Sequence, residues 1–309
     1  MSLLSSRSRR ADGPLRRPAG RRWAVVGLVA LGMAVPGVSA GQAAAAEPTA
    51  APLAAVTQAV VRTLGLTAGV SMELAGATSL GPGSQVVRAT GSYDFPGDRG
   101  GVILAPARGV NEPIVFTPLE VFIRPPAGAA SLLPKKKPWM VANFVSPEAL
   151  ATNFPQFVLQ IESVDPGFTL AELSWGAVTA ESRGTTTVGG APARRYRVTV
   201  DLGQAAARAT GPARTPFAYA IASERANQSG SANQLGAMTV DVWVDSHGRV
   251  VRVADSPPGA GVGTTTLDLG DFGRLISVTA PAASHVVDVA EIAPNAEREN
   301  NGRGDSDGG

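Results

Sequence analysis

The chain has 309 residues, no cysteine and a formal net charge of +2. The absence of cysteine excludes a disulfide-stapled small domain, a zinc–thiolate site and thiol-based catalysis. Seven of the 27 basic residues but only one of the 25 acidic residues lie in the first 22 positions, so the rest of the chain has a net charge of about −4. Nucleic-acid binding needs a basic surface, and we therefore expect no nucleic acid partner.

The N-terminal segment, residues 1–46, has the parts of a secretory signal peptide. Its arginine-rich start is followed by an apolar run from Trp23 to about Val38 and then by small residues. The run is shorter than the ~20 residues that a membrane-spanning helix needs. We expect export to the cell envelope or beyond, with cleavage near Ala40 or Ala46. Retention of the segment as an N-terminal anchor is the alternative.

The sequence after this segment predicts one helix and then a series of short strands. Apolar residues recur every three or four positions over residues 52–64, the spacing of an amphipathic helix, and Gly65 ends the pattern. Beyond it, apolar residues alternate with polar ones, which is typical of half-buried antiparallel strands. Such stretches lie at residues 69–76, 85–95, 101–104, 113–116, 119–124 and 138–144.

Helical segments interrupt the strands in the middle of the chain. Ser146, Pro147 and Glu148 supply an N-cap, a proline at the first helical position and an acid in the first turn. An apolar stripe follows, and Pro155 should kink or split this helix. A second short helix is expected at residues 169–176. A weak helix, or a helix with a loop, is expected at residues 219–238.

Strands return at residues 194–202, 238–245, 249–254, 264–269 and 275–279. This order of elements predicts an α+β fold, with an antiparallel sheet and helices on one face. We expect residues 47–293 to form a single domain. Residues 294–309 are polar and rich in glycine, and we expect them to be a disordered tail.

No motif in the chain predicts catalysis. The text match to G-x-S-x-G at residues 37–41 lies in the signal segment rather than between a strand and a helix. His247 is expected in a hairpin turn and His285 at the surface, while Asp241 and Asp245 are expected on the solvent-facing side of one strand. We therefore expect no catalytic residue, no metal and no cofactor.

The lysine run at residues 135–137 is the only dense basic run after the signal segment. It is either a solvated loop or a contact for anionic lipid head groups, where each charge adds about 1 kcal/mol near a membrane. Lys135, Lys136 and Lys137 are therefore the candidate head-group contacts.

Several segments together resemble one family. Residues 189–202 (GGAPARRYRVTVDL), 239–250 (TVDVWVDSHGRV) and 266–273 (TLDLGDFG), with 278–281 (VTAP) after the last, resemble the second half of the actinobacterial LppX/LprG-type envelope lipoproteins, which are relatives of the LolA carrier fold. Residues 91–95 and the helix after Glu148 fit as well. The resemblance covers residues 52–292.

The resemblance implies a strongly bent antiparallel sheet, a half-barrel, with helices packed on its concave face. Sheet and helices would enclose an apolar cavity for the acyl chains of an envelope lipid or glycolipid. The chain departs from the family at Gly41, which stands where the family carries its lipid-modified cysteine. A cysteine-linked lipid anchor is therefore excluded.

The resemblance predicts an exported, monomeric lipid carrier or chaperone that is not an enzyme, with a membrane surface as a further possible partner. The alternatives are a regulatory or sensor module that binds a protein partner, and a secreted enzyme with a polar cleft. The inward-facing side chains could leave a cavity or fill a solid core. The candidate cavity residues are Val70, Met72, Leu74, Val87, Val121, Ile123, Trp139, Val141, Leu150, Phe154, Phe157, Ile161, Tyr196, Val198, Val240, Val242 and Val244.

Overall fold

The computed structural model describes residues 50–76, 85–106, 111–125, 133–143, 165–209, 237–255, 264–289 and 291. The predicted signal segment, the helix after Glu148 and the C-terminal tail lie outside these residues, as does most of the predicted segment 219–238. Within the described ranges, no helix combines the length and the apolar character needed to cross a membrane.

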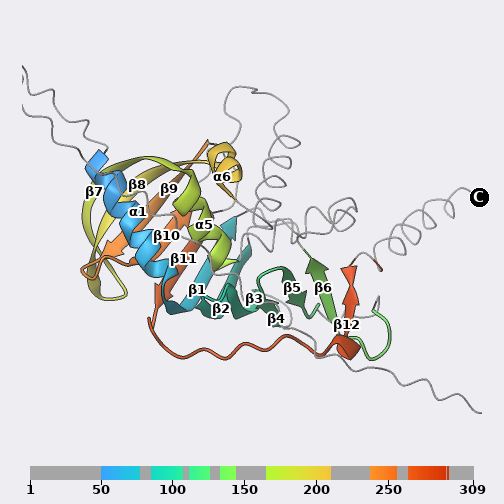
Figure 1. Cartoon of the computed structure of the whole chain (residues 1–309). Helices are drawn as coiled ribbons and strands as arrows, with labels where there is room; N and C mark the ends of the chain where they lie inside the picture. The colour runs from blue at the N-terminus through green and yellow to red at the C-terminus, as the bar shows by residue number, and fades with distance from the viewer. Residues whose placement is uncertain are drawn as a thin grey trace, which may run out of the picture. The chain divides into compact units, whose positions relative to one another are not determined.

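Twelve strands of the described chain form one open sheet, in the order β12-β6-β5-β4-β3-β2-β1-β11-β10-β9-β8-β7 (Figure 1). Neighbouring strands are antiparallel throughout, except that β12 is parallel to β6. The α+β class and the antiparallel sheet are therefore confirmed. The strands are β1 (Thr67–Gly76), β2 (Gln85–Asp94), β3 (Arg99–Pro106), β4 (Glu112–Phe116), β5 (Glu120–Ile123), β6 (Trp139–Asn143), β7 (Ala177–Val188), β8 (Ala191–Asp201), β9 (Ala237–Asp245), β10 (Val250–Asp255), β11 (Thr264–Gly270) and β12 (Val286–Asp288).

One face of the sheet carries the hydrophobic core, and we call it the inner face. Residues directly opposite each other on paired strands share a face, so the register can be followed from strand to strand. Met72 lies opposite both Ala89 and Leu267, and all three belong to one buried hydrophobic cluster. The same cluster continues through Val242 on β9 to Val198 on β8. The alternating pattern of the sequence therefore sorts the strands into an apolar inner face and a polar outer face.

The described α-helices are α1 (Ala50–Leu64), α5 (Pro166–Gly176) and α6 (Leu202–Arg208). Helix α1 buries the side chains of Val56, Ala59, Val60 and Thr63, a spacing of three to four residues that places them on one helical face. It runs across β7–β10 and also contacts α5 (Figure 1). Asp165 and Asp201 cap α5 and α6, because their carboxylates accept hydrogen bonds from backbone N–H groups of the first turn.

The structure corrects the prediction in several places. The predicted strand at residues 275–279 is wrong, because these residues lie in irregular backbone between β11 and the 3₁₀ helix η2 (Ala283–His285). Leu275, its first residue, is 99% exposed. Strands β7 and β12 and helix α6 were not predicted, and Leu202 begins α6 rather than ending a strand.

Candidate functional site

The candidate cavity residues of the inner face come together in the core. All the described candidates except Trp139 and Val141 belong to the large buried hydrophobic cluster. These residues are Val70, Met72, Leu74, Val87, Val121, Ile123, Tyr196, Val198, Val240, Val242 and Val244. Leu150, Phe154, Phe157 and Ile161 lie outside the described residues. The sequence pattern thus selected side chains that share one face of the sheet across many strands.

Trp139 and Val141 are placed differently. Val141 lies opposite Phe122 on β5, whereas the inner-face residue Ile123 lies opposite Met140. Successive residues of a strand point to opposite faces, so Trp139 and Val141 lie on the outer face and the structure does not bring them together with the others. Met140 and Ala142 occupy the inner positions of β6.

A pocket of about 470 Å³ lies where α1 meets the ends of β7 and β8 and the turn between β9 and β10. Tyr196 and Val244 belong both to its wall and to the hydrophobic core, so the pocket borders the core directly. Small or polar side chains form the rest of the wall. The lining residues are Ala55, Gln58, Ala59, Arg62, Thr185, Pro192, Ala193, Arg194, Tyr196, Val244, Asp245, Ser246 and Gly248.

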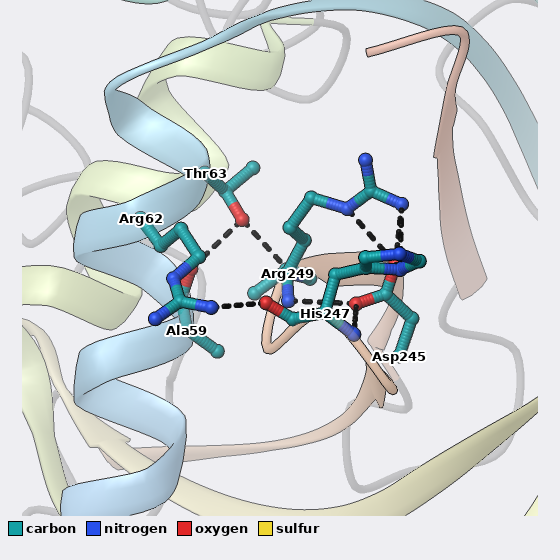
Figure 2. A network of polar contacts seen from close by, with 7 residues as sticks. Ala59, Arg62, Thr63, Asp245, His247 and Arg249 are labelled. Atoms are coloured by element: carbon teal, nitrogen blue, oxygen red, sulfur yellow. Dashed lines mark hydrogen bonds and ion pairs between the residues drawn. The ribbon is translucent and has the colours of Figure 1, made fainter.

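Thr63 anchors α1 beside this pocket. Its hydroxyl donates to the carbonyl of Ala59 at 2.8 Å and accepts the backbone N–H of Val250 at 2.9 Å (Figure 2). The Thr63 side chain is fully buried, and the Val250 N–H belongs to the first residue of β10. One buried hydroxyl therefore links the last turn of the helix to the β9–β10 hairpin.

The turn between β9 and β10 is held by Asp245. Its carboxylate accepts the backbone N–H groups of His247 and Arg249, each at 2.9 Å, and the Arg249 guanidinium at 2.9 and 2.7 Å (Figure 2). Burial opposes the charge, but the hydrogen bonds and the charge of Arg249 outweigh it and lower the pKa of Asp245. Arg62 of α1 donates to the His247 carbonyl, which closes the contact between helix and turn. The predicted hairpin turn is confirmed.

A second polar cluster surrounds the Tyr93 hydroxyl, which donates to Asp98 at 3.0 Å. The same hydroxyl also interacts with Asp165, the N-cap of α5. Burial is the main cause that raises the pKa of Asp98 to about 6 and that of Asp165 to about 7. The cluster joins the β2–β3 turn to the start of α5, and neither carboxylate lines the pocket.

The outer face holds an ion-pair network that the sequence interpretation placed in solvent. Asp241 is only 8% exposed, and its carboxylate accepts from Arg195 at 2.6 Å and from Arg197 at 3.3 Å. These guanidinium bonds outweigh the cost of burial and lower the pKa of Asp241. The predicted outer-face position of Asp241 and Asp245 is confirmed by the strand register. The expectation that their carboxylates lie in solvent is wrong, because neighbouring arginines cover both.

Trp243 extends this outer-face network. The guanidinium groups of Arg195 and Arg252 lie 5.2 and 5.9 Å from its ring centre, in the range of cation–π contacts. Arg252 also pairs with Asp268 on β11, at 2.5 and 2.8 Å. These contacts join β8 to β11 across the outer face.

The lysine run lies in a turn before β6, with Lys135 and Lys136 exposed and Lys137 half-buried. His247 and His285 are also exposed, as the sequence predicted. Within the described ranges, no group of three or more His, Asp or Glu residues could hold a metal ion.

Arg62 and Arg194 were not among the predicted site residues, although both line the pocket. Arg194 lies on the same face of β8 as the inner-face residues Tyr196 and Val198. A charged residue among these apolar positions was a signal that the sequence already contained. Arg62 carries no comparable signal, because it lies on the exposed side of α1.

Comparison with known proteins yields structural similarity alone. No protein-family model and no curated protein sequence matches the chain. Among solved structures, LprF from Mycobacterium bovis is 13% identical with a TM-score of 0.39, and the match covers 76% of this chain and 99% of LprF. The lipoprotein LppX from Mycobacterium tuberculosis is 16% identical with a TM-score of 0.40, covering 74% of this chain and 98% of LppX.

A LolA superfamily protein from Nitrosomonas europaea is 9% identical with a TM-score of 0.29, and the match covers 74% of this chain and 94% of that protein.

Proposed function

We propose that the chain is an exported lipid-binding protein that shelters acyl chains against the inner face of its sheet. The observation that carries this proposal is the width of the apolar inner face. It continues from β1 through Val102, Ile114 and Ile123 to Met140 on β6. Among the described elements, the helices pack mainly on β7–β10. These strands lie toward the opposite end of the strand order from β6. The apolar face therefore extends beyond the strands that the described helices contact, and its side chains are buried within the chain.

A carrier needs such a surface because acyl chains are costly to expose. Each CH₂ group in water costs about 0.8 kcal/mol, so a chain of about 16 carbons costs on the order of 12 kcal/mol. Aliphatic side chains of the inner face offer a surface that removes this cost. In this proposal the N-terminal segment directs export, the protein acts as a monomer and carries out no catalytic step, and a lipid or glycolipid of the cell envelope is the cargo.

Neighbouring residues on β3 provide a matched test. Leu104 is half-buried, packs against the core and lies opposite Ala89 on the inner face. Ile103, the preceding residue, points to the outer face and is 48% exposed. The Leu104→Trp variant should place a large ring on the proposed lipid surface, whereas Ile103→Trp adds the same ring on the other face.

The measurement is mass spectrometry of an organic extract from the full chain, purified without detergent from an actinobacterial host. We expect stoichiometric lipid in the wild-type protein and in Ile103→Trp, and at most about half as much in Leu104→Trp. Circular dichroism and thermal unfolding identify variants that fold. Lipid-free wild-type protein, or equal lipid in both folded variants, would contradict the proposal.

A further inference from the structure

The pocket beside α1 carries two arginines, Arg62 and Arg194, that form no ion pair with any residue the structure describes. Arg194 lies on β8, and within the described part of the chain its guanidinium has no hydrogen-bond or ion-pair partner. Arg62 reaches the pocket from α1 and uses one guanidinium nitrogen to donate to the His247 carbonyl. An arginine has five N–H donors, so most donors of both side chains remain available to a ligand.

The one carboxylate in the wall does not offset these charges. Asp245 is occupied by the Arg249 guanidinium and by two backbone N–H groups of its own turn. Arg249 is not among the residues that line the pocket. The charge of Asp245 is therefore balanced from outside the pocket, and Arg62 and Arg194, both exposed to solvent, leave the pocket wall with an excess of positive charge.

The rest of the wall suits a polar ligand of moderate size. Thr185 and Ser246 supply hydroxyl groups and Gln58 supplies an amide, which can bond to phosphate or sugar oxygens. The pocket is partly open to solvent, and its volume of about 470 Å³ lies within the range of small-molecule sites. Ala55, Ala59 and Ala193 leave room for a ligand, because their short side chains do not extend far into the pocket.

We infer that this pocket binds the phosphate group of an anionic lipid head group, with Arg194 and Arg62 as its ligands. Guanidinium groups bind phosphate through paired N–H donors, which favours arginine over lysine at such sites. Tyr196 and Val244, shared between pocket and core, form the apolar side of the pocket. They belong to the same inner face of the sheet as the proposed acyl-chain surface, at its β7–β10 end. The inference rests on the proposed function for the acyl chains, and it adds the chemical class of the lipid.

Calorimetric titration of the full chain with three ligands separates the contributions. Dihexanoylphosphatidylglycerol has both chains and phosphate, dihexanoylglycerol has the chains alone, and glycerol 1-phosphate has the phosphate alone. A hydrogen bond to a charged group contributes enough for about a 10-fold or larger change in affinity. We expect the phospholipid to bind at least about 10-fold more tightly than dihexanoylglycerol, and Arg194→Gln to remove this advantage.

Two further variants sharpen the test. Arg62→Gln should lose less affinity than Arg194→Gln, because one Arg62 nitrogen is already held by the turn. Arg88→Gln is the matched control. Arg88 lies on β2, pairs with Glu73 and is not part of the pocket wall, so this variant removes one positive charge and should bind the phospholipid as the wild type does.

The outcomes distinguish the two proposals. If glycerol 1-phosphate binds as tightly as the phospholipid and both depend on Arg194, the phosphate site stands and the lipid function fails. If dihexanoylglycerol binds as tightly as the phospholipid and Arg194→Gln changes neither, the phosphate site is overturned while lipid binding stands. If none of the three ligands binds, both proposals fail.

Discussion

Replacing Thr63 with valine should destabilise the protein through a single hydrogen bond. Valine preserves the shape of the side chain but removes the hydroxyl that accepts the Val250 N–H at 2.9 Å. The Ala59 carbonyl keeps its helical bond to the backbone N–H four residues on, so the loss falls on the Val250 N–H. A buried donor left without an acceptor costs about 1–3 kcal/mol.

Helix α1 contains its own control for this experiment. The Thr57 hydroxyl donates to the Leu53 carbonyl at 2.9 Å, as the Thr63 hydroxyl does to Ala59, but Thr57 is exposed and makes no hydrogen bond to β10 within the described structure. Thr57→Val should therefore change the free energy of unfolding by no more than about 0.5 kcal/mol. Thr63→Ser retains the acceptor and should recover most of the loss.

Urea unfolding followed by circular dichroism measures these differences directly. In a domain of this size each kcal/mol corresponds to about 2–4 °C in Tm, so thermal scans should rank the variants in the same order. Equal losses in Thr63→Val and Thr57→Val would refute the reasoning, because they would show that the bond to Val250 contributes nothing beyond the common effect of removing a helical hydroxyl.

Two further predictions concern the β2–β3 region. A Cβ added at Gly91 would lie 2.0 Å from the Gly101 carbonyl oxygen, so Gly91→Ala should lower the free energy of unfolding in urea by about 1–3 kcal/mol. In Gly101→Ala the nearest atom to the new Cβ would be 3.7 Å away, so this variant should lose clearly less stability. Equal losses in the two variants would contradict the close approach at Gly91. Burial raises the pKa of Asp98 to about 6 and that of Asp165 to about 7. A carboxyl group whose pKa is raised by folding stabilises the folded protein fully at pH values below its pKa in the unfolded chain. This stabilisation is lost as the pH rises through its pKa in the folded protein. The free energy of unfolding should therefore fall between about pH 4 and pH 7, and a pH series in urea should show a weaker fall in Asp165→Asn; an unchanged slope in that variant would count against the shifted pKa.

The parts of the fold that sequence could predict are those where pattern and pairing agree. Strands β1 and β2 alternate strictly and pair along their whole lengths, so a period of two located both. Residues 275–279 show that the pattern alone is not sufficient. Ile276 and Val278 are half-buried while Ser277 between them is exposed, as in a strand, but within the described residues no neighbouring strand pairs with this segment.

Each of the three missed elements has its own physical reason. Strand β7 lies at the edge of the sheet and most of its residues are exposed, so its sequence lacks the apolar alternation that marks a half-buried strand. Strand β12 has three residues and forms through its parallel pairing with β6, which is far away in sequence. Helix α6 has seven residues and is too short to show a helical period.

The pocket shows where sequence reasoning stops for the site as well. Thr63 follows Val56 and Val60 in the buried stripe of α1, and a hydroxyl in such a stripe already indicates a hidden partner, because a buried polar group without one is costly. The identity of that partner could not be predicted, since Val250 lies 187 residues away along the chain. The contact brings Arg62 against the β9–β10 turn, on the same pocket wall as Arg194. The pairing of the two arginines is therefore a product of tertiary structure, and loosening the Thr63 anchor should weaken phosphate binding even though Thr63 does not line the pocket.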